Sequence, residues 1–197
     1  MPEDHPDLAG RLNSLGNKLL YADQEMLDEA GKVYQRTLQG YEKELGSEHT
    51  STLNTVNNLG NLFVDQRRLD EAKKMYQRVL QGREKALRLE HISTFDTVNS
   101  LGNLYVDHGQ LDEAERMYQR VLQGYEKALS HEQVNTYIPA LNTTEKLAIL
   151  YKQMGRANEA EDLYSRAPYG LEAVLGRPSK RCQDIITALA IFHGDRG

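Results

Sequence analysis

The residues whose type and spacing suggest chemistry in this sequence are asparagines. With a helical step of about 100° per residue, Asn54, Asn57, Asn58 and Asn61 fall on one arc together with Asp65. An asparagine carboxamide offers two N–H donors and an acceptor oxygen, which suits the main chain of an extended peptide. The pattern therefore predicts a polar binding face. The alternative is that these amides bond between adjacent helices and set their spacing.

This arc recurs because the chain itself recurs. His49–Glu90 and His91–Glu132 are identical at 29 of 42 positions without a gap, and degraded copies flank the pair on both sides. A fixed period in this range predicts an array of stacked units, each burying its apolar face against its neighbours. The other positions predicted on the polar face are Asn13, Asn17, Asp96, Asn99, Asn103 and Asp107.

Each repeat is predicted to fold as two helices. In the second repeat the first helix runs from about Thr50 to Gln66 and buries a stripe formed by Leu53, Val56, Leu59, Leu62 and Phe63. A break follows at Arg67-Arg68, where the third repeat has Gly109. A second helix then begins near Asp70, whose carboxylate would cap free backbone N–H groups; the matching Asp112 has Glu115 three residues on, as in a capping box.

The second helix is predicted to cross the first at close range. Its apolar stripe comprises Ala72, Met75, Tyr76, Val79, Leu80, Ala86 and Leu87, with Lys74, Arg78, Gln81 and Lys85 in solvent. A glycine, Gly82, lies on the stripe although glycine in a helix costs about 1 kcal/mol relative to alanine. Its recurrence as Gly40 and Gly124 indicates close helix approach or a slight kink.

Several other chemistries are disfavoured. The net charge of -5 argues against binding a phosphate backbone, and no apolar run approaches the length of a membrane span. Cys182 is a lone cysteine, and the histidines recur once per repeat in a loop rather than at the close spacing of a zinc site. No catalytic motif is present, so we expect no enzyme activity, no cofactor and no metal, in a cytoplasmic protein.

These residues resemble a known family. A small residue after leucine (Leu59-Gly60), an aromatic residue at Phe63, and an alanine and an aromatic residue four apart (Ala72, Tyr76) resemble the tetratricopeptide repeat pattern. The 42-residue length is similar to the repeats of kinesin light chains. The resemblance implies an all-α, right-handed superhelix of stacked helical hairpins, a TPR solenoid.

In tetratricopeptide arrays the first helices line a concave groove, so the resemblance implies that the asparagines face inward there. Some relatives bind the terminal carboxylates of a peptide with lysine and arginine on these faces. Here the asparagines of that clamp are matched at Asn17, Asn61 and Asn103, but its cations are replaced by asparagine and serine. Lys146 alone keeps a positive charge at such a position, which argues against recognition of that kind of tail.

We expect one array over the whole chain, 1–197. Its repeats would span 5–48, 49–90, 91–136 and 137–177, followed by 178–197 as a partial fifth repeat or capping helix. Both ends resemble cuts from a longer array, with a naturally short protein as the competing interpretation.

The expected function is a non-catalytic protein-interaction module that binds an extended peptide or protein segment, and neither nucleic acid nor membrane. One alternative is a structural or regulatory array within a larger NTPase-type signalling protein. Another is self-association through the C-terminal helix, whose apolar residues Ile185, Ile186, Leu189 and Ile191 have no predicted partner helix.

Overall fold

The chain forms two compact helical units, Met1–Leu104 and Tyr105–Gly197. The computed structural model describes residues 10, 13–14, 24–87 and 92–164, which are helical apart from short turns. No helix in this described part is long and apolar enough to span a bilayer. The predicted terminal helix at 178–193 lies outside these residues, as do Asn17 and Cys182.

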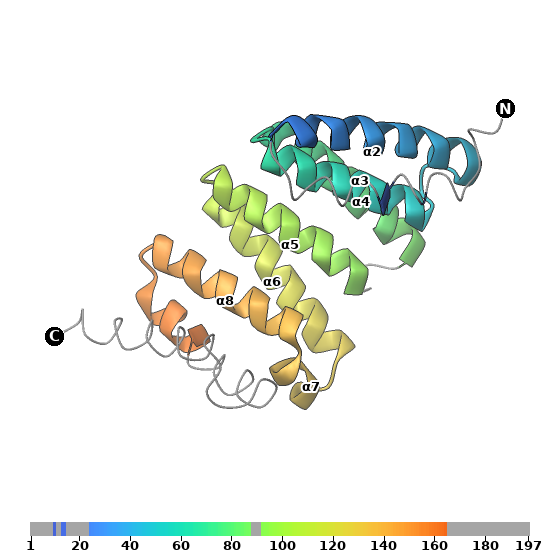
Figure 1. Ribbon diagram of the computed structural model, residues 1–197. Helices are drawn as coiled ribbons and strands as arrows, with labels where there is room; N and C mark the ends of the chain where they lie inside the picture. Colours follow the sequence, from blue (N-terminus) through green and yellow to red (C-terminus); the bar gives the residue numbers. More distant parts are fainter. Residues whose placement is uncertain (1–9, 11–12, 15–23, 88–91, 165–197) are drawn as a thin grey trace. The chain divides into compact units, whose positions relative to one another are not determined.

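In the first unit, helices that follow one another in the chain lie side by side and run antiparallel (Figure 1). Helix α2 packs on α3 and α3 packs on α4, while α5 begins in this unit. Their bounds are α2 Gln24–Leu45, α3 Thr50–Asp65, α4 Leu69–Leu87 and α5 Ile92–Asp107. The predicted hairpin of the second repeat is therefore confirmed, with the end of its first helix one residue earlier than expected.

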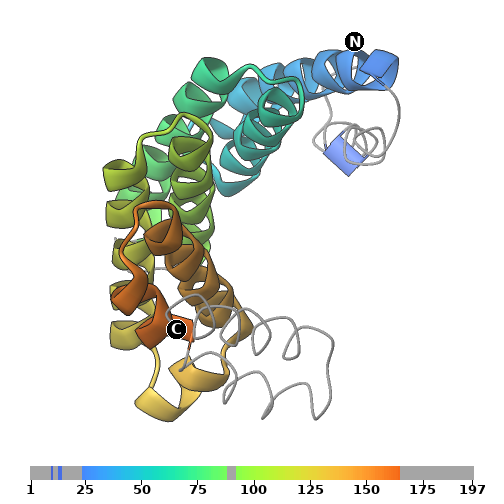
Figure 2. The ribbon, with the colours of Figure 1, turned by 90° about the vertical axis from the view of Figure 1, so that its left-hand side faces the viewer.

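The second unit repeats the hairpin with an insertion. Helix α6 (Leu111–Ala128) packs on α8 (Ile138–Gln153), and a further helix is described at 157–164. The short α7 (His131–Thr136) forms the joint between α6 and α8 (Figure 2). It begins with a capping box in which Ser130 and Gln133 bond reciprocally, a signal that our sequence analysis missed. The inserted residues between the third and fourth repeats thus form a helical turn.

Small residues allow the helices of a hairpin to approach closely. A Cβ added to Gly60 would lie 2.7 Å from the ring of Tyr76, and one added to Gly82 would lie 2.7 Å from a methyl carbon of Leu53. Ala72 is completely buried, as are its equivalents Ala30, Ala114 and Ala160. The glycine on the apolar stripe is therefore explained by the close approach of α3 and α4.

The break between α3 and α4 has left-handed backbone geometry. Arg67 has φ 59°, and the glycines at the matching turns, Gly109 and Gly155, have φ 69° and 73°. Left-handed φ brings a Cβ close to the following carbonyl and costs roughly 1–2 kcal/mol, a cost from which glycine is exempt. The second repeat therefore carries a local strain that the third and fourth repeats avoid.

Replacing Arg67 with glycine should raise the free energy of unfolding by up to about 1 kcal/mol, because relief of the strain exceeds the extra chain entropy of glycine. Urea denaturation followed by circular dichroism measures the change. The control is Gly109→Ala, which introduces the same strain into the matching turn and should destabilise. An Arg67→Gly protein no more stable than the parent would contradict this account.

Four expectations about the second helices are corrected. Asp112 and Glu115 form no capping box, because α6 begins at Leu111 after Gln110, and Glu115 instead accepts a hydrogen bond from Tyr151 of α8. Asp70 is likewise the second residue of α4 and not its cap. Arg78 is half-buried and paired with Glu42 of α2, while Ala86, expected on the apolar stripe, is exposed.

Candidate functional site

The candidate site is the polar side of the first helices, which we call the amide face. Its members in the first unit are Asn54, Asn57, Asn58, Asn61 and Asp65 on α3, and Asp96, Asn99 and Asn103 on α5. Asn54, Asp65, Asp96 and Asn103 are exposed, and the other four are half-buried. The residues on the opposite side of α3, such as Val56, Leu59 and Leu62, are buried, so the expected division of this helix into two faces is confirmed.

A buried arginine reaches this face from α4. Arg83 is only 8% exposed; its Nη2 donates to Oδ1 of Asn54 on α3 at 2.8 Å, and its Nη1 donates to Oγ1 of Thr97 on α5 at 2.8 Å. Nη1 also donates to the backbone carbonyl of Ser93. Burial lowers the pKa of Arg83 from its ordinary value, and the nearby carboxylate of Asp96 opposes that effect. Arg83 therefore links the first helices of two successive repeats.

Tyr76 makes a second link two turns away on α4. Its hydroxyl donates to Oδ1 of Asn61 on α3 at 2.7 Å, and it also hydrogen-bonds with Ser100 on α5. Burial raises the pKa of Tyr76 to about 12; the bond with Ser100 opposes this, and the charge of Asp65 adds to it. From the Arg83 link to the Tyr76 link, the bonded residues advance along the sequence in both α3 and α5, so these two helices run in the same direction.

These links determine how the carboxamides are oriented. Arginine has only donors, so the atom of Asn54 that faces Arg83 is the oxygen and the NH₂ group points elsewhere. The oxygen of Asn61 is likewise engaged by Tyr76. At both positions the carbonyl oxygen is used within the protein, and no described residue accepts a hydrogen bond from the N–H donors.

The first repeat contributes one described residue to the face. Asn13 accepts a hydrogen bond through Oδ1 from Nδ2 of Asn58 at 3.3 Å, and the hydroxyl of Thr55 lies 3.4 Å from the same oxygen. This bond joins first helices of adjacent repeats, which is the second role that we considered for the amides. Asn57 is half-buried, and within the described part of the chain its side chain has no hydrogen bond.

The remaining predicted positions fall in the second unit. Asp107 is exposed at the end of α5. Burial raises the pKa of Tyr118 above its usual range, and the charge of Asp107 adds to this effect. Lys146 is half-buried on α8; burial lowers its pKa, and Glu145 opposes that effect. The pair formed by Asp107 and Tyr118 matches Asp65 and Tyr76 one repeat earlier, so the polar face is built on a repeated plan.

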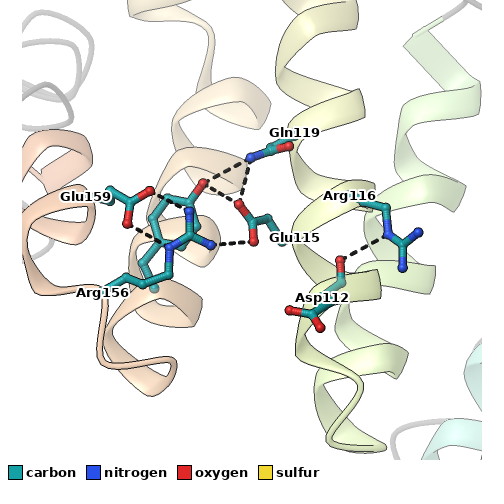
Figure 3. A network of polar contacts seen from close by, with 7 residues as sticks. Asp112, Glu115, Arg116, Gln119, Arg156 and Glu159 are labelled. Carbon is teal, nitrogen blue, oxygen red and sulfur yellow. Dashed lines mark hydrogen bonds and ion pairs between the residues drawn. The ribbon is translucent and has the colours of Figure 1, made fainter.

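A second polar cluster lies in the second unit and connects α6 with the fourth repeat (Figure 3). Glu115 accepts hydrogen bonds from the Tyr151 hydroxyl at 2.9 Å and from Gln119 at 2.8 Å, and it pairs with Arg156 at 2.5 Å. Arg156 also pairs with Glu159 and stacks on the Tyr151 ring at 4.2 Å, and both carboxylates raise its pKa.

In this cluster Glu115, Arg156 and Glu159 each pair with another member. The arrangement around Arg156 also recurs at the matching turn of another repeat. In the second repeat, Arg68 stacks on Phe63 at 4.4 Å and pairs with Glu71, in the same arrangement as Arg156, Tyr151 and Glu159. The recurrence indicates that this cluster stabilises the turn between the helices of a repeat. We therefore assign it to the framework and not to the candidate site.

The loop histidine of the second repeat, His49, has a structural role. His49 is the N-cap of α3, and its Nδ1 accepts a hydrogen bond from the backbone N–H of Ser51 at 3.2 Å. No group of three or more histidine, cysteine, aspartate or glutamate side chains that could hold a metal occurs among the described residues.

Sequence reasoning missed Arg83, which we did not assign to either face of its helix. The signal that could have revealed it is its position next to Gly82 on the apolar stripe, where the first and third repeats have Tyr41 and Tyr125. Both tyrosines are buried. A charged residue in a place that is aromatic in two other copies is a reason to look for buried acceptors nearby.

The architecture defines a class of protein: an all-α chain of consecutive helical hairpins that recur with a period of 42 residues. The family model described as tetratricopeptide repeat matches residues 10–85, 55–127 and 93–167. The chain therefore belongs to the tetratricopeptide repeat family.

Solved structures show the same fold. BtubC (BKLC) from P. vanneervenii is similar with a TM-score of 0.76 and 24% identity, over 91% of this chain and 70% of that one. A Podosopora anserina protein of the kinesin light chain type, with nearly identical TPR-like repeats, is similar with a TM-score of 0.71 and 20% identity, over 98% of both chains. A search of curated proteins gives no match.

The expected fold class, a TPR solenoid of the kinesin light chain type, is confirmed by these likenesses. Tetratricopeptide repeats are generally protein-interaction modules without catalytic activity.

Proposed function

We propose that the chain binds an extended segment of a partner protein along the amide face of α3 and α5. The observation that carries the proposal is the fixed orientation of Asn54, whose oxygen accepts from the buried Arg83 while its N–H donors are directed elsewhere. Main-chain carbonyl oxygens of an extended peptide are the natural acceptors for such donors. Asn57 lies between Asn54 and Asn61 on this face and adds a carboxamide to which no described residue is hydrogen-bonded.

A rigid face favours binding because the protein loses little freedom when the ligand arrives. The amides at Asn54 and Asn61 are each bonded to a residue of α4, and Arg83 holds both first helices at once. Pre-organised polar groups avoid part of the ordering cost of association. A peptide recognised mainly through its backbone would bind with limited dependence on its side chains.

Selection of a random peptide library of about ten residues on the full chain should yield binders, and Asn57→Ala should weaken the selected peptides about tenfold. The expected loss corresponds to a hydrogen bond or two, about 1.4 kcal/mol. Affinities are measured by fluorescence anisotropy, with helicity and melting temperature checked in parallel. Asn57 is preferred over Asn54 and Asn61 because its replacement breaks no described framework bond.

The matched control is Gln81→Ala, which removes an exposed carboxamide from the opposite, solvent side of α4. It should leave peptide affinity unchanged. A library that yields no binders would refute the proposal. Equal affinity in the Asn57→Ala and Gln81→Ala proteins would place binding somewhere other than the amide face.

A further inference from the structure

The amide face is deficient in positive charge. Neither α3 nor α5 contains a lysine or an arginine. Their charged residues are the carboxylates Asp65, Asp96 and Asp107, and all three are exposed. A ligand lying along these helices in the first unit therefore meets carboxamides, hydroxyls and the carboxylates Asp65 and Asp96.

The cation that reaches the face from α4 is not available to a ligand. Arg83 is only 8% exposed, and it already donates to three acceptors on α3 and α5. It compensates Asp96 only in part: burial raises the pKa of Asp96 above its usual value, and the charge of Arg83 opposes this. A further positive charge placed next to the Asp96 carboxylate would stabilise its ionised form.

The two carboxylates of the first unit lie at opposite ends of the face. Asp96 lies at the level of the Arg83 link, and Asp65 lies one turn beyond Asn61, which marks the level of the Tyr76 link. Asn54 and Asp65 are eleven positions apart in one helix, a rise of roughly 16 Å. An extended chain covers that distance in about five residues.

We propose that the segment bound by the amide face is basic, with two lysine or arginine side chains about five residues apart that pair with Asp65 and Asp96. This inference rests on the proposed function and names the chemistry of its partner. The carboxamide donors of α3 bind main-chain carbonyl oxygens between the two cations, and the carboxylates repel an acidic segment.

The library selection described above tests this directly. Selected peptides should be enriched in lysine and arginine at that spacing. Two synthetic peptides of about ten residues, identical except for two lysines or two glutamates five residues apart, then serve as defined probes. The lysine peptide should bind at least about tenfold more tightly than the glutamate peptide, and its affinity should fall as salt rises.

The variants Asp65→Asn and Asp96→Asn should each remove most of this preference. Asp65→Asn is the cleaner of the two, because Asp65 lies away from Arg83. The controls are Asp70→Asn and Asp112→Asn, which neutralise exposed carboxylates in the first turns of α4 and α6 and should leave the preference unchanged.

The possible failures are distinguishable. Selected peptides without a basic bias, or equal binding of the two synthetic peptides, would overturn the charge inference and leave binding by the amide face intact. A library without binders would overturn the proposed function and this inference with it. A lysine preference that survives Asp65→Asn and Asp96→Asn would overturn the assignment to these carboxylates.

Discussion

Replacing Arg83 with methionine should lower the free energy of unfolding by about 2–3 kcal/mol. Methionine retains most of the length and apolar volume of the side chain but leaves the acceptors on α3 and α5 without their charged donor. Thr97 is fully buried, so its hydroxyl loses a partner that water cannot easily replace. Loss of a hydrogen bond to a charged group, or of the partner of a buried polar group, costs about 1–3 kcal/mol.

The matched control for this variant is Arg78→Met in the same helix. Arg78 pairs with Glu42 and has a side chain that is 34% exposed, so its replacement should cost less than about 1 kcal/mol. Urea denaturation of the two variants beside the parent measures both values. A loss for Arg83→Met no greater than that for Arg78→Met would show that the buried links contribute little to stability.

Replacing Gly60 with alanine should destabilise the protein by about 1–3 kcal/mol, the reverse of the usual gain from glycine to alanine in a helix. The added Cβ would lie 2.7 and 2.9 Å from two carbons of the Tyr76 ring, which cannot yield without moving α4 and its bond to Asn61. In the fourth repeat Ala148 occupies this position in one core with Tyr164. A repeat can thus hold the methyl group, but only with packing adapted to it.

Gly31→Ala in α2 is the control for this substitution. Its Cβ would meet only a terminal methyl carbon of Leu62 at 3.3 Å, which a small rotation of the leucine can relieve. This variant should be neutral or more stable by up to about 1 kcal/mol. Thermal melting followed by circular dichroism compares the two, and a Gly60→Ala protein as stable as the Gly31→Ala protein would contradict a rigid crossing.

The helical hairpins could be predicted from the sequence because apolar periodicity and an internal repeat gave the same answer. The helix expected from Thr50 to Gln66 runs from Thr50 to Asp65, and the break expected at Arg67-Arg68 is present. Ala72, Tyr76 and Val79 are buried as the stripe predicted. These features depend on local chain geometry and on which face of a helix is apolar, and both can be read from spacing.

The polar links could not be predicted in the same way. Spacing placed the asparagines on one face, but it does not show which carboxamide oxygen meets a donor from another helix. Asp112 and Glu115 have the spacing of a capping box, yet Glu115 bonds across to Tyr151 and Arg156 because α8 packs beside it. Periodicity alone also gives no reason to place an arginine among buried residues, since a charge is buried only where tertiary contacts supply acceptors.

The hydrogen bonds that Arg83 and Tyr76 of α4 make with α5 also bear on which repeats fold and unfold together. In a stacked array, stability is the sum of terms within each repeat and terms between neighbours, and strong neighbour terms make repeats unfold together. Arg83 and Tyr76 place several polar bonds of the second repeat on the first helix of the third. The compact unit accordingly ends at Leu104, well inside the third repeat. The period of the sequence therefore marks a unit of duplication, whereas the compact unit extends past the second repeat into the first helix of the third.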